Sequence, residues 1–132
     1  MSAAADSLKK IPLFAGLDDK ELEGIAERMV ERRFKAGETL TQQGASGAGF
    51  FVISEGTADV AVDGESRRTI GAGDYFGEIA LLTDGDRTRT ATITASTDMV
   101  TYGMTVWEFK PLVESNADLA WKLLTAMAAK LA

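Results

Sequence analysis

GDYFGEIALL, residues 73–82, and RTATI, residues 89–93, are the most informative segments of this chain. In the first segment, a glycine-flanked entry leads into a short apolar run that can form one or two helical turns. The free backbone N–H groups at the start of such a turn attract anions, and Gly77 lets an anion approach the backbone closely. In the second segment, Arg89 supplies a guanidinium fork suited to phosphate, and Thr90 adds a hydroxyl donor. Together the two segments predict a phosphate site.

Glu78 lies inside this anion-binding segment, where a phosphate would repel its carboxylate. The position makes sense if Glu78 accepts hydrogen bonds from hydroxyl groups, as a sugar offers them. A phosphate beside a sugar hydroxyl indicates a nucleotide. The alternative is that Glu78 accepts hydrogen bonds from buried backbone amides and has a structural role.

Segments typical of β-strands surround this stretch, from about Phe34 to Thr105. They are rich in Val, Ile, Thr, Phe and Tyr, and turns that contain most of the 13 glycines separate them. Asp63-Gly64 is a favourable two-residue hairpin turn. Regular short strands with closely spaced turn signals predict an antiparallel sandwich or barrel of about eight strands.

Both ends of the chain have helical patterns. From Leu8 to about Arg33, apolar residues recur at helical spacing, with Asp18 as a candidate N-cap and Glu21 as its capping-box partner. We expect the first six residues to be frayed. Near the C-terminus, Asn116 can cap a helix with one apolar stripe, formed by Leu119, Ala120, Leu123, Leu124, Met127, Ala128 and Leu131. This stripe can cover the sheet or pair with a second copy, and we expect Trp107 and Trp121 to be core residues.

Composition excludes several classes of function. The chain has 132 residues, a net charge of −6, no Cys and no His. The acidic balance argues against nonspecific nucleic-acid binding. Without Cys and His there are no disulfides, thiol nucleophiles, Ser-His-Asp triads, Cys/His zinc sites or cupin metal sites. No apolar run approaches the roughly 20 residues of a membrane span. We therefore expect a cytoplasmic protein that is not an enzyme and that has no metal site and no cofactor.

The chain resembles the cyclic nucleotide-binding domain family, which includes the bacterial catabolite activator protein, protein kinase A regulatory subunits and cyclic nucleotide-gated channels. FGEIAL, residues 76–81, is similar to the opening of the family's phosphate-binding cassette, and RTATI to its arginine end. Agreement extends to AGE at 36–38 with Gly44, to FVISEG at 51–56, and to Leu13-Phe14 with Leu22. The resemblance covers about residues 8–131.

The resemblance implies a mainly β fold with flanking helices. Its centre is an antiparallel double-stranded β-helix jelly roll, or β-roll, with a short phosphate-cassette helix. We expect a single domain over residues 1–132. It comprises an N-terminal helical segment (1–33), the β-roll (34–105) and two C-terminal helices (106–132).

The resemblance also implies roles for the site residues. Arg89 is expected to pair with the cyclic phosphate, and Glu78 to accept from the ribose 2′-hydroxyl. Backbone amides around Gly77, Ile79 and Ala80 are expected to contact ribose or phosphate. Thr90 lies where the family places a small residue beside phosphate and base, which leaves both cyclic AMP and cyclic GMP open. The predicted ligand-binding set is Phe76, Gly77, Glu78, Ile79, Ala80, Arg89, Thr90 and Ala91.

Residues 83–88 form a longer linker than the usual cassette has, and they lack the proline often found before the arginine. Two arginines therefore compete for the phosphate. Counting forward from Glu78 favours Arg87, and counting back from the strand at 91–93 favours Arg89. We choose Arg89, because it leads directly into a strand, whereas a loop absorbs insertions easily.

These features predict a sensor module for cyclic AMP or cyclic GMP, in which ligand binding moves the C-terminal helices. The alternative keeps the fold as a protein-interaction or dimerisation module that binds no nucleotide. Expected partners are the cyclic nucleotide, an effector protein or domain, and a second copy through the C-terminal helix. The chain ends at Ala132 before any helix-turn-helix, so we do not expect it to read DNA by itself.

Overall fold

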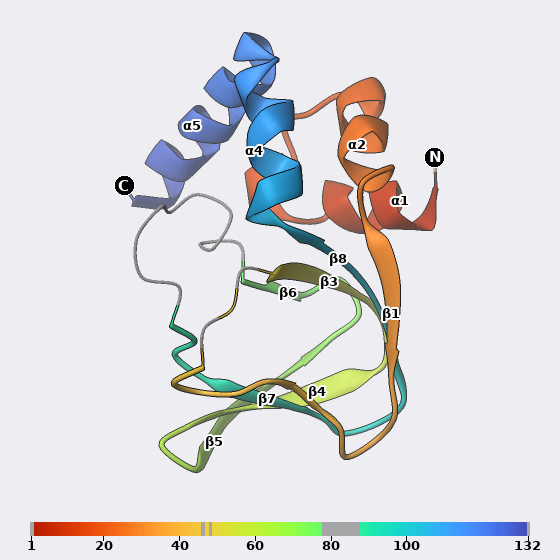
Figure 1. Cartoon of the computed structure of the whole chain (residues 1–132), viewed down its shortest axis with the longest axis vertical. Coiled ribbons are helices and arrows are strands. Elements are labelled where there is room, and N and C mark those ends of the chain that lie inside the picture. The colour runs from red at the N-terminus through yellow and green to blue at the C-terminus, as the bar shows by residue number, and fades with distance from the viewer. Residues whose placement is uncertain (1, 46, 48, 78–87, 132) are drawn as a thin grey trace.

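The computed structural model of the chain describes residues 2–45, 47, 49–77 and 88–131. The strands form a roll at one end of the molecule, and the helices pack together at the other end (Figure 1). The N-terminal and C-terminal helices thus lie on the same side of the roll. Among the described residues, no helix is both long enough and apolar enough to span a membrane.

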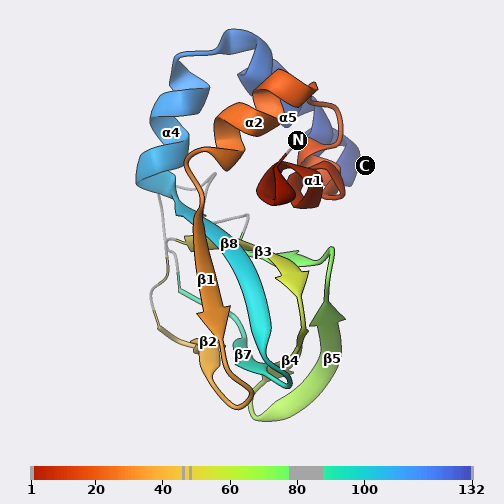
Figure 2. The same cartoon turned by 90° about the vertical axis from the view of Figure 1, so that its right-hand side faces the viewer.

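The roll consists of two four-stranded antiparallel sheets, which lie one above the other in Figure 1. Figure 2 shows the same roll after a turn of 90°. The first sheet has the order β1 (Val30–Phe34), β8 (Met99–Thr105), β3 (Gly49–Glu55), β6 (Tyr75–Phe76). The second has the order β2 (Thr39–Thr41), β7 (Thr92–Ala95), β4 (Thr57–Val62), β5 (Glu65–Gly71). This arrangement confirms the predicted antiparallel β-roll.

The helices precede and follow the roll. They are α1 (Ala3–Lys9), the 3₁₀ turn η1 (Pro12–Phe14), α2 (Asp19–Ala26), α4 (Val106–Glu114) and α5 (Ala117–Leu131). The predicted caps are present, because they depend only on local sequence. The Asp18 carboxylate accepts from the Glu21 amide at 2.8 Å, and the Glu21 carboxylate accepts from the Asp18 amide at 3.0 Å. The Asn116 side chain accepts from the Leu119 amide at 3.1 Å.

The N-terminal segment differs from the sequence prediction in two places. The helical pattern expected to reach Arg33 ends at Ala26, and Val30–Phe34 forms strand β1 against β8. Met29 and Val30 continue the helical spacing, yet Val30 is 60% exposed, because pairing with β8 determines the conformation here. Residues 3–6, which we expected to be frayed, belong to α1, and the Ser2 hydroxyl caps this helix by accepting from the Ala5 amide at 3.2 Å.

The predicted turn at Asp63-Gly64 joins β4 to β5. Asp63 has a φ of 54° and Gly64 a φ of 80°. Positive φ at both central residues is what a two-residue hairpin turn of type I′ requires, and Asp followed by Gly tolerates it well. The local sequence therefore determines this turn.

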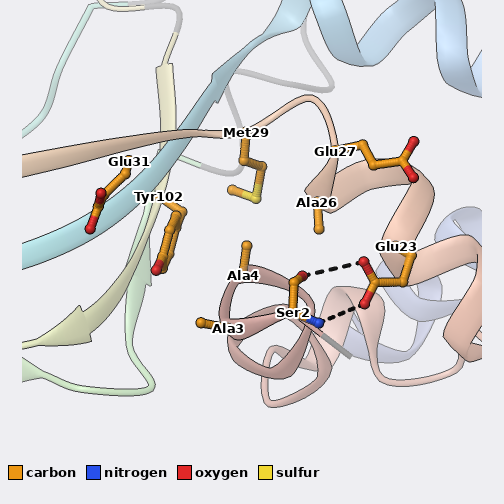
Figure 3. Close-up of a pocket in the computed structure, with 9 residues that line it drawn as sticks. All are labelled: Ser2, Ala3, Ala4, Glu23, Ala26, Glu27, Met29, Glu31 and Tyr102. Carbon is orange, nitrogen blue, oxygen red and sulfur yellow. Dashed lines mark hydrogen bonds between the residues drawn. The ribbon is translucent and has the colours of Figure 1, made fainter.

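A groove of about 330 Å³ lies beside the N-terminal helices, where α1 and α2 meet β1 and β8 (Figure 3). Three glutamates line it, Glu23, Glu27 and Glu31, together with apolar atoms of residues such as Met29. Glu23 also accepts a hydrogen bond of 2.7 Å from the backbone amide of Ser2. This hydrogen bond joins the N-cap of α1 to α2.

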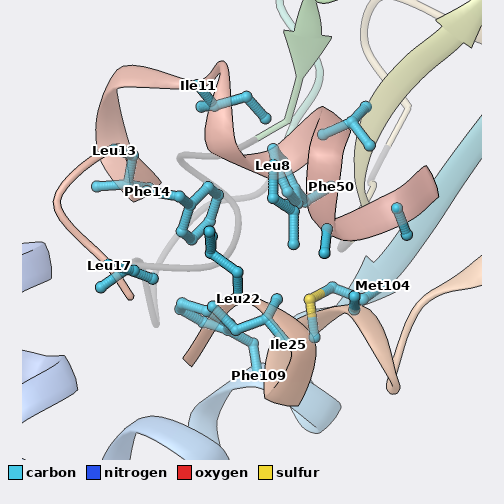
Figure 4. Close-up of a cluster of buried hydrophobic side chains, with 14 of the residues drawn as sticks. Leu8, Ile11, Leu13, Phe14, Leu17, Leu22, Ile25, Phe50, Met104 and Phe109 are labelled. Carbon is cyan, nitrogen blue, oxygen red and sulfur yellow. The ribbon is translucent and has the colours of Figure 1, made fainter. Parts of the chain in front are cut away.

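The hydrophobic core has two parts because side chains alternate along β3. Phe50 and Val52 face the helices, in a cluster that includes Leu8, Phe14, Leu22, Ile25, Met104, Phe109 and Leu119 (Figure 4). Ile53 faces the inside of the roll, in a cluster that includes Phe34, Val60, Ile70, Phe76, Ile93 and Met99. Strand β3 thus connects the interior of the roll to the helical end.

The C-terminal helices leave large apolar side chains in solvent. Leu119 and Leu123 of α5 are buried, but Leu124 is exposed, and Trp107 and Trp121 are 70% and 68% exposed. The expectation that both tryptophans are core residues is therefore wrong. Periodicity identifies an apolar face, but it does not reveal what covers that face.

An ion pair joins the two helical segments. Lys122 of α5 lies 2.7 Å from a Glu21 carboxylate oxygen of α2 and 3.4 Å from Asp118. The hydrogen bond to Glu21 is the largest of the causes that raise the pKa of Lys122 above its ordinary 10.5. A raised pKa in the folded state stabilises the fold below the unfolded-state pKa, and this stabilisation is lost as the pH rises through the folded-state pKa.

We expect Lys122→Met to lower the free energy of unfolding at pH 7. We expect this deficit to shrink as the pH rises above 10.5, the ordinary lysine pKa, and through the raised pKa of Lys122 in the folded state. Urea unfolding at both pH values measures the change. Lys20→Met on the exposed face of α2 is the matched control, since it removes a lysine that has no ion pair in the described part of the chain. Equal deficits of Lys122→Met at the two pH values would contradict the assigned ion pair.

Candidate functional site

Arg89 lies just before β7, where its backbone pairs with the loop that follows β2. Its amide donates to the carbonyl of Ala45 at 2.8 Å, and its own carbonyl accepts from the amide of Gly44 at 2.9 Å. Two hydrogen bonds therefore hold the Arg89 backbone in place. The side chain then reaches β3, where Nη2 donates to the carbonyl oxygen of Gly49 at 2.6 Å.

Three glycines surround the Arg89 side chain. A Cβ built on Gly47 would overlap Nε of Arg89, and a Cβ built on Gly77 would lie 2.8 Å from Nη1. A Cβ on Gly77 would also overlap the carbonyl oxygen of Gly49. The guanidinium thus lies directly against backbone from two segments. We call Gly47, Gly49 and Gly77 with Arg89 the arginine cradle.

Gly77 has a second reason to be glycine, because its φ is +84°. We expect Gly77→Ala to lower the free energy of unfolding by more than the roughly 1–2 kcal/mol that left-handed backbone costs an L-residue, since overlap with Gly49 adds to that cost. Urea denaturation measures the change.

Gly64→Ala is the matched control for this prediction. Gly64 has a φ of +80°, and a Cβ there would meet nothing within 4 Å. The difference between the two variants therefore isolates the close approach at the cradle. Equal losses would contradict a tight cradle.

Partial burial changes the electrostatics of Arg89. Desolvation lowers the pKa of its guanidinium, because a less polar environment disfavours the charged form. An arginine nevertheless stays protonated in proteins. In the ranges that the structure describes, no carboxylate forms an ion pair with Arg89. A half-buried cation on neutral backbone groups is suited to an anionic partner.

Phe76 lies beside the cradle in β6. It is 8% exposed and stacks on Phe51 of β3 with ring centroids 5.1 Å apart. The Phe51 ring in turn lies close to Gly49, where an added Cβ would be 2.8 Å from it. Phe76 thus belongs to the core of the roll, and it supports the strand that leads into Gly77.

Of the remaining site candidates, the structure describes only the two that follow Arg89. Thr90 is exposed and Ala91 is half-buried, and both follow Arg89 directly. The Ala91 carbonyl accepts from the Thr41 hydroxyl at 3.2 Å. Glu78, Ile79, Ala80 and Arg87 lie outside the described residues. The structure therefore brings together Phe76, Gly77 and Arg89 from the predicted set, and the choice between the two arginines stays a prediction.

Sequence reasoning missed two residues of the cradle, Gly47 and Gly49. In the sequence, Gly47 belongs to a glycine-containing turn and Gly49 precedes an apolar segment, and neither pattern points to Arg89. Their contact with Arg89 arises because β3 and the segment before β7 meet across the roll, some 40 residues apart. A local pattern does not contain that information.

Two other features of the described residues bear on the chemistry. No group of three or more His, Cys, Asp or Glu residues is arranged to hold a metal ion within the described ranges. Three glutamates, Glu23, Glu27 and Glu31, are among the residues that line the groove in Figure 3. Like charges repel, so this groove disfavours an anion, whereas the cradle favours one.

Comparisons with known proteins identify the family of this fold. The family model for the cyclic nucleotide-binding domain matches residues 31–116. The N-terminal domain of a transcriptional regulator from Streptomyces coelicolor A3(2) is similar, with a TM-score of 0.86 and 30% identity. The similarity covers 96% of this chain and 90% of that chain.

Two further solved structures share the fold. A cyclic nucleotide-binding-like protein from Brucella abortus has a TM-score of 0.75 and 21% identity, over 86% of this chain and 99% of its own. The regulatory domain of Toxoplasma gondii PKA, co-crystallised with cAMP, has a TM-score of 0.72 and 28% identity. That match covers 83% of this chain and 43% of the PKA chain.

The family model covers more than half of the chain, and the regulator domain is 30% identical over nearly all of it. The β-roll and its flanking helices agree with both. This chain therefore belongs to the cyclic nucleotide-binding domain family.

Proposed function

We propose that this protein binds a cyclic nucleotide, cyclic AMP or cyclic GMP, and acts as a non-catalytic sensor module. The observation that carries the proposal is the arginine cradle, in which backbone of β3 and Gly77 position a half-buried guanidinium. The related regulatory domain of Toxoplasma gondii PKA was crystallised with cAMP, which supports the choice of ligand.

In this proposal, Arg89 binds the cyclic phosphate, since a guanidinium fork suits phosphate oxygens. Glu78 accepts from the ribose 2′-hydroxyl, and amides at Gly77, Ile79 and Ala80 donate to ribose or phosphate. Thr90 lies beside the base, and a hydroxyl there also suits guanine. Phe76 and Ala91 flank these groups. Arg87 is the alternative phosphate ligand, and residues 1–132 act as one domain.

The proposed response is a shift between two positions of the C-terminal helices. A ligand produces such a shift only by binding one state more tightly than the other. A packed path runs from the cradle toward these helices. Gly49 accepts from Arg89, and the next residue, Phe50, packs on Phe14 at a centroid distance of 5.6 Å. Phe14 in turn contacts Phe109 of α4 at 6.3 Å.

Thermal unfolding with added nucleotides tests the proposal. A ligand that binds only the folded state stabilises it by mass action, so we expect cyclic AMP or cyclic GMP at a hundredfold excess over Kd to raise Tm by roughly 5–15 °C. Inorganic phosphate and 5′-AMP are the controls, and we expect smaller shifts with both. Identical curves with and without both cyclic nucleotides would contradict the proposal.

A second candidate function is docking of another protein or of a second copy. The observation that favours it is the exposure of Trp107, Trp121 and Leu124 on the C-terminal helices. Sedimentation velocity over a range of concentrations tests self-association. Trp121→Ser is expected to weaken any dimer, whereas a monomer at all concentrations leaves an effector as the remaining partner.

A further inference from the structure

The Gln43 side chain makes two hydrogen bonds to the β4–β5 hairpin. Its side-chain amide donates to the Asp63 carboxylate at 2.8 Å, and its side-chain oxygen accepts from the Asp63 backbone amide at 2.8 Å. Both polar atoms of the Gln43 side chain are thus paired with one residue. Gln43 is half-buried, although Asp63 is exposed.

The same residue is tied to β7 through its backbone. The Gln43 amide donates to the Thr92 hydroxyl at 3.0 Å. The next two residues, Gly44 and Ala45, make the two backbone hydrogen bonds that hold Arg89. Gln43 therefore stands directly before the pair that fixes the Arg89 backbone.

Gly44, directly after Gln43, has a φ of +86°. Glycine loses more conformational freedom on folding than any other residue, so a contact at the neighbouring Gln43 helps to fix the backbone at this position. The hairpin tip at Asp63-Gly64 is by contrast a tight two-residue turn between paired strands. Hydrogen bonds with Asp63 in this turn therefore restrict the conformation of Gln43 and of the residues next to it.

We propose that the Gln43–Asp63 contact is a clamp that positions Arg89 for its anionic ligand. The clamp fixes Gly44 and Ala45, these two residues hold the Arg89 backbone, and the guanidinium then reaches Gly49 in the cradle. Gln43 and Asp63 are positioning residues that act through Arg89. This inference rests on the proposed function, in which Arg89 binds the phosphate.

Asp63 offers a matched pair of variants for the test. Asn and Gly both tolerate the φ of 54°, and both remove the charge of Asp63. Only Asn keeps a side-chain oxygen that can accept from Gln43. We therefore expect Asp63→Gly to weaken cyclic AMP binding about three- to tenfold, the usual range for one hydrogen bond, and Asp63→Asn to bind about as wild type.

Gln43→Leu tests the clamp from its other side. Combined with Arg89→Ala, it distinguishes positioning of Arg89 from a general structural role of Gln43. We expect the same three- to tenfold loss in the wild-type background. In an Arg89→Ala background we expect no further loss, because residues that act through one group are not additive. Independent losses that add in the double variant would overturn the clamp, as would wild-type affinity for both Gln43→Leu and Asp63→Gly.

Amide hydrogen exchange without ligand separates this inference from the proposed function. We expect Gln43→Leu and Asp63→Gly to speed exchange of the Arg89 amide, and Asp63→Asn to leave it unchanged. Unchanged exchange in the first two variants would overturn the clamp even if cyclic AMP binds. If the wild type binds neither cyclic nucleotide, the proposed function fails, and faster Arg89 exchange in those variants would still establish that the Gln43–Asp63 contact holds the Arg89 backbone.

Discussion

Replacing Arg89 with alanine is expected to weaken cyclic nucleotide binding by about 2–5 kcal/mol, or roughly thirtyfold to several thousandfold in Kd. The reason is that the variant leaves the phosphate charge without its partner in a partly buried site. Arg89 has no ion pair among the described residues that would share its charge, and its guanidinium rests on neutral backbone groups. Calorimetric titration of both proteins with cyclic AMP and cyclic GMP measures the loss.

Arg67→Ala is the matched control, because it removes an exposed arginine of β5 that pairs with Glu65 at 3.5 Å. We expect it to bind as wild type, since exposed ion pairs contribute little. Urea unfolding of Arg89→Ala is the control that establishes whether the variant is folded at the titration temperature. Wild-type affinity in a folded Arg89→Ala variant would contradict the site and would favour Arg87.

Replacing Phe14 with alanine is expected to lower the free energy of unfolding by about 3–5 kcal/mol, the usual cost for a buried aromatic ring. Phe14 is fully buried and contacts Phe50 of β3 and Phe109 of α4 (Figure 4). Its ring therefore joins the N-terminal helices, the roll and the C-terminal helices. Urea denaturation at neutral pH measures the change.

Trp107→Ala is the control for this prediction. It removes a larger ring that is 70% exposed, so we expect an effect within about 0.5 kcal/mol. A loss below about 1 kcal/mol for Phe14→Ala would contradict the packing in which one ring holds the three parts together.

Features decided by neighbouring residues could be predicted from the sequence. The Asp63-Gly64 turn, the Asp18 and Glu21 capping box and the Asn116 cap all form as expected. Each depends on contacts within three residues, so the competing alternatives are few. The arrangement of strands into a β-roll followed from the resemblance, and the observed sheets agree with it.

Features decided by distant contacts were predicted less well. Val30 fits a helical stripe, but strand pairing with β8 wins, because it satisfies a row of backbone groups. The same limit applies to the site. Gly77 and Arg89 could be identified from their chemistry. Gly47 and Gly49 could be identified only from the structure, which places them against the Arg89 side chain. The clamp between Gln43 and Asp63 likewise joins residues 20 positions apart.

Calorimetric titration of the wild-type chain tests the central claim most directly. The account predicts one saturable site per chain for cyclic AMP or cyclic GMP, and it predicts that Arg89→Ala raises the Kd of this site by a factor of about thirty or more. The result that would contradict it is the absence of saturable heat with both nucleotides at concentrations up to about 1 mM, a Kd that corresponds to only about 4 kcal/mol of binding free energy.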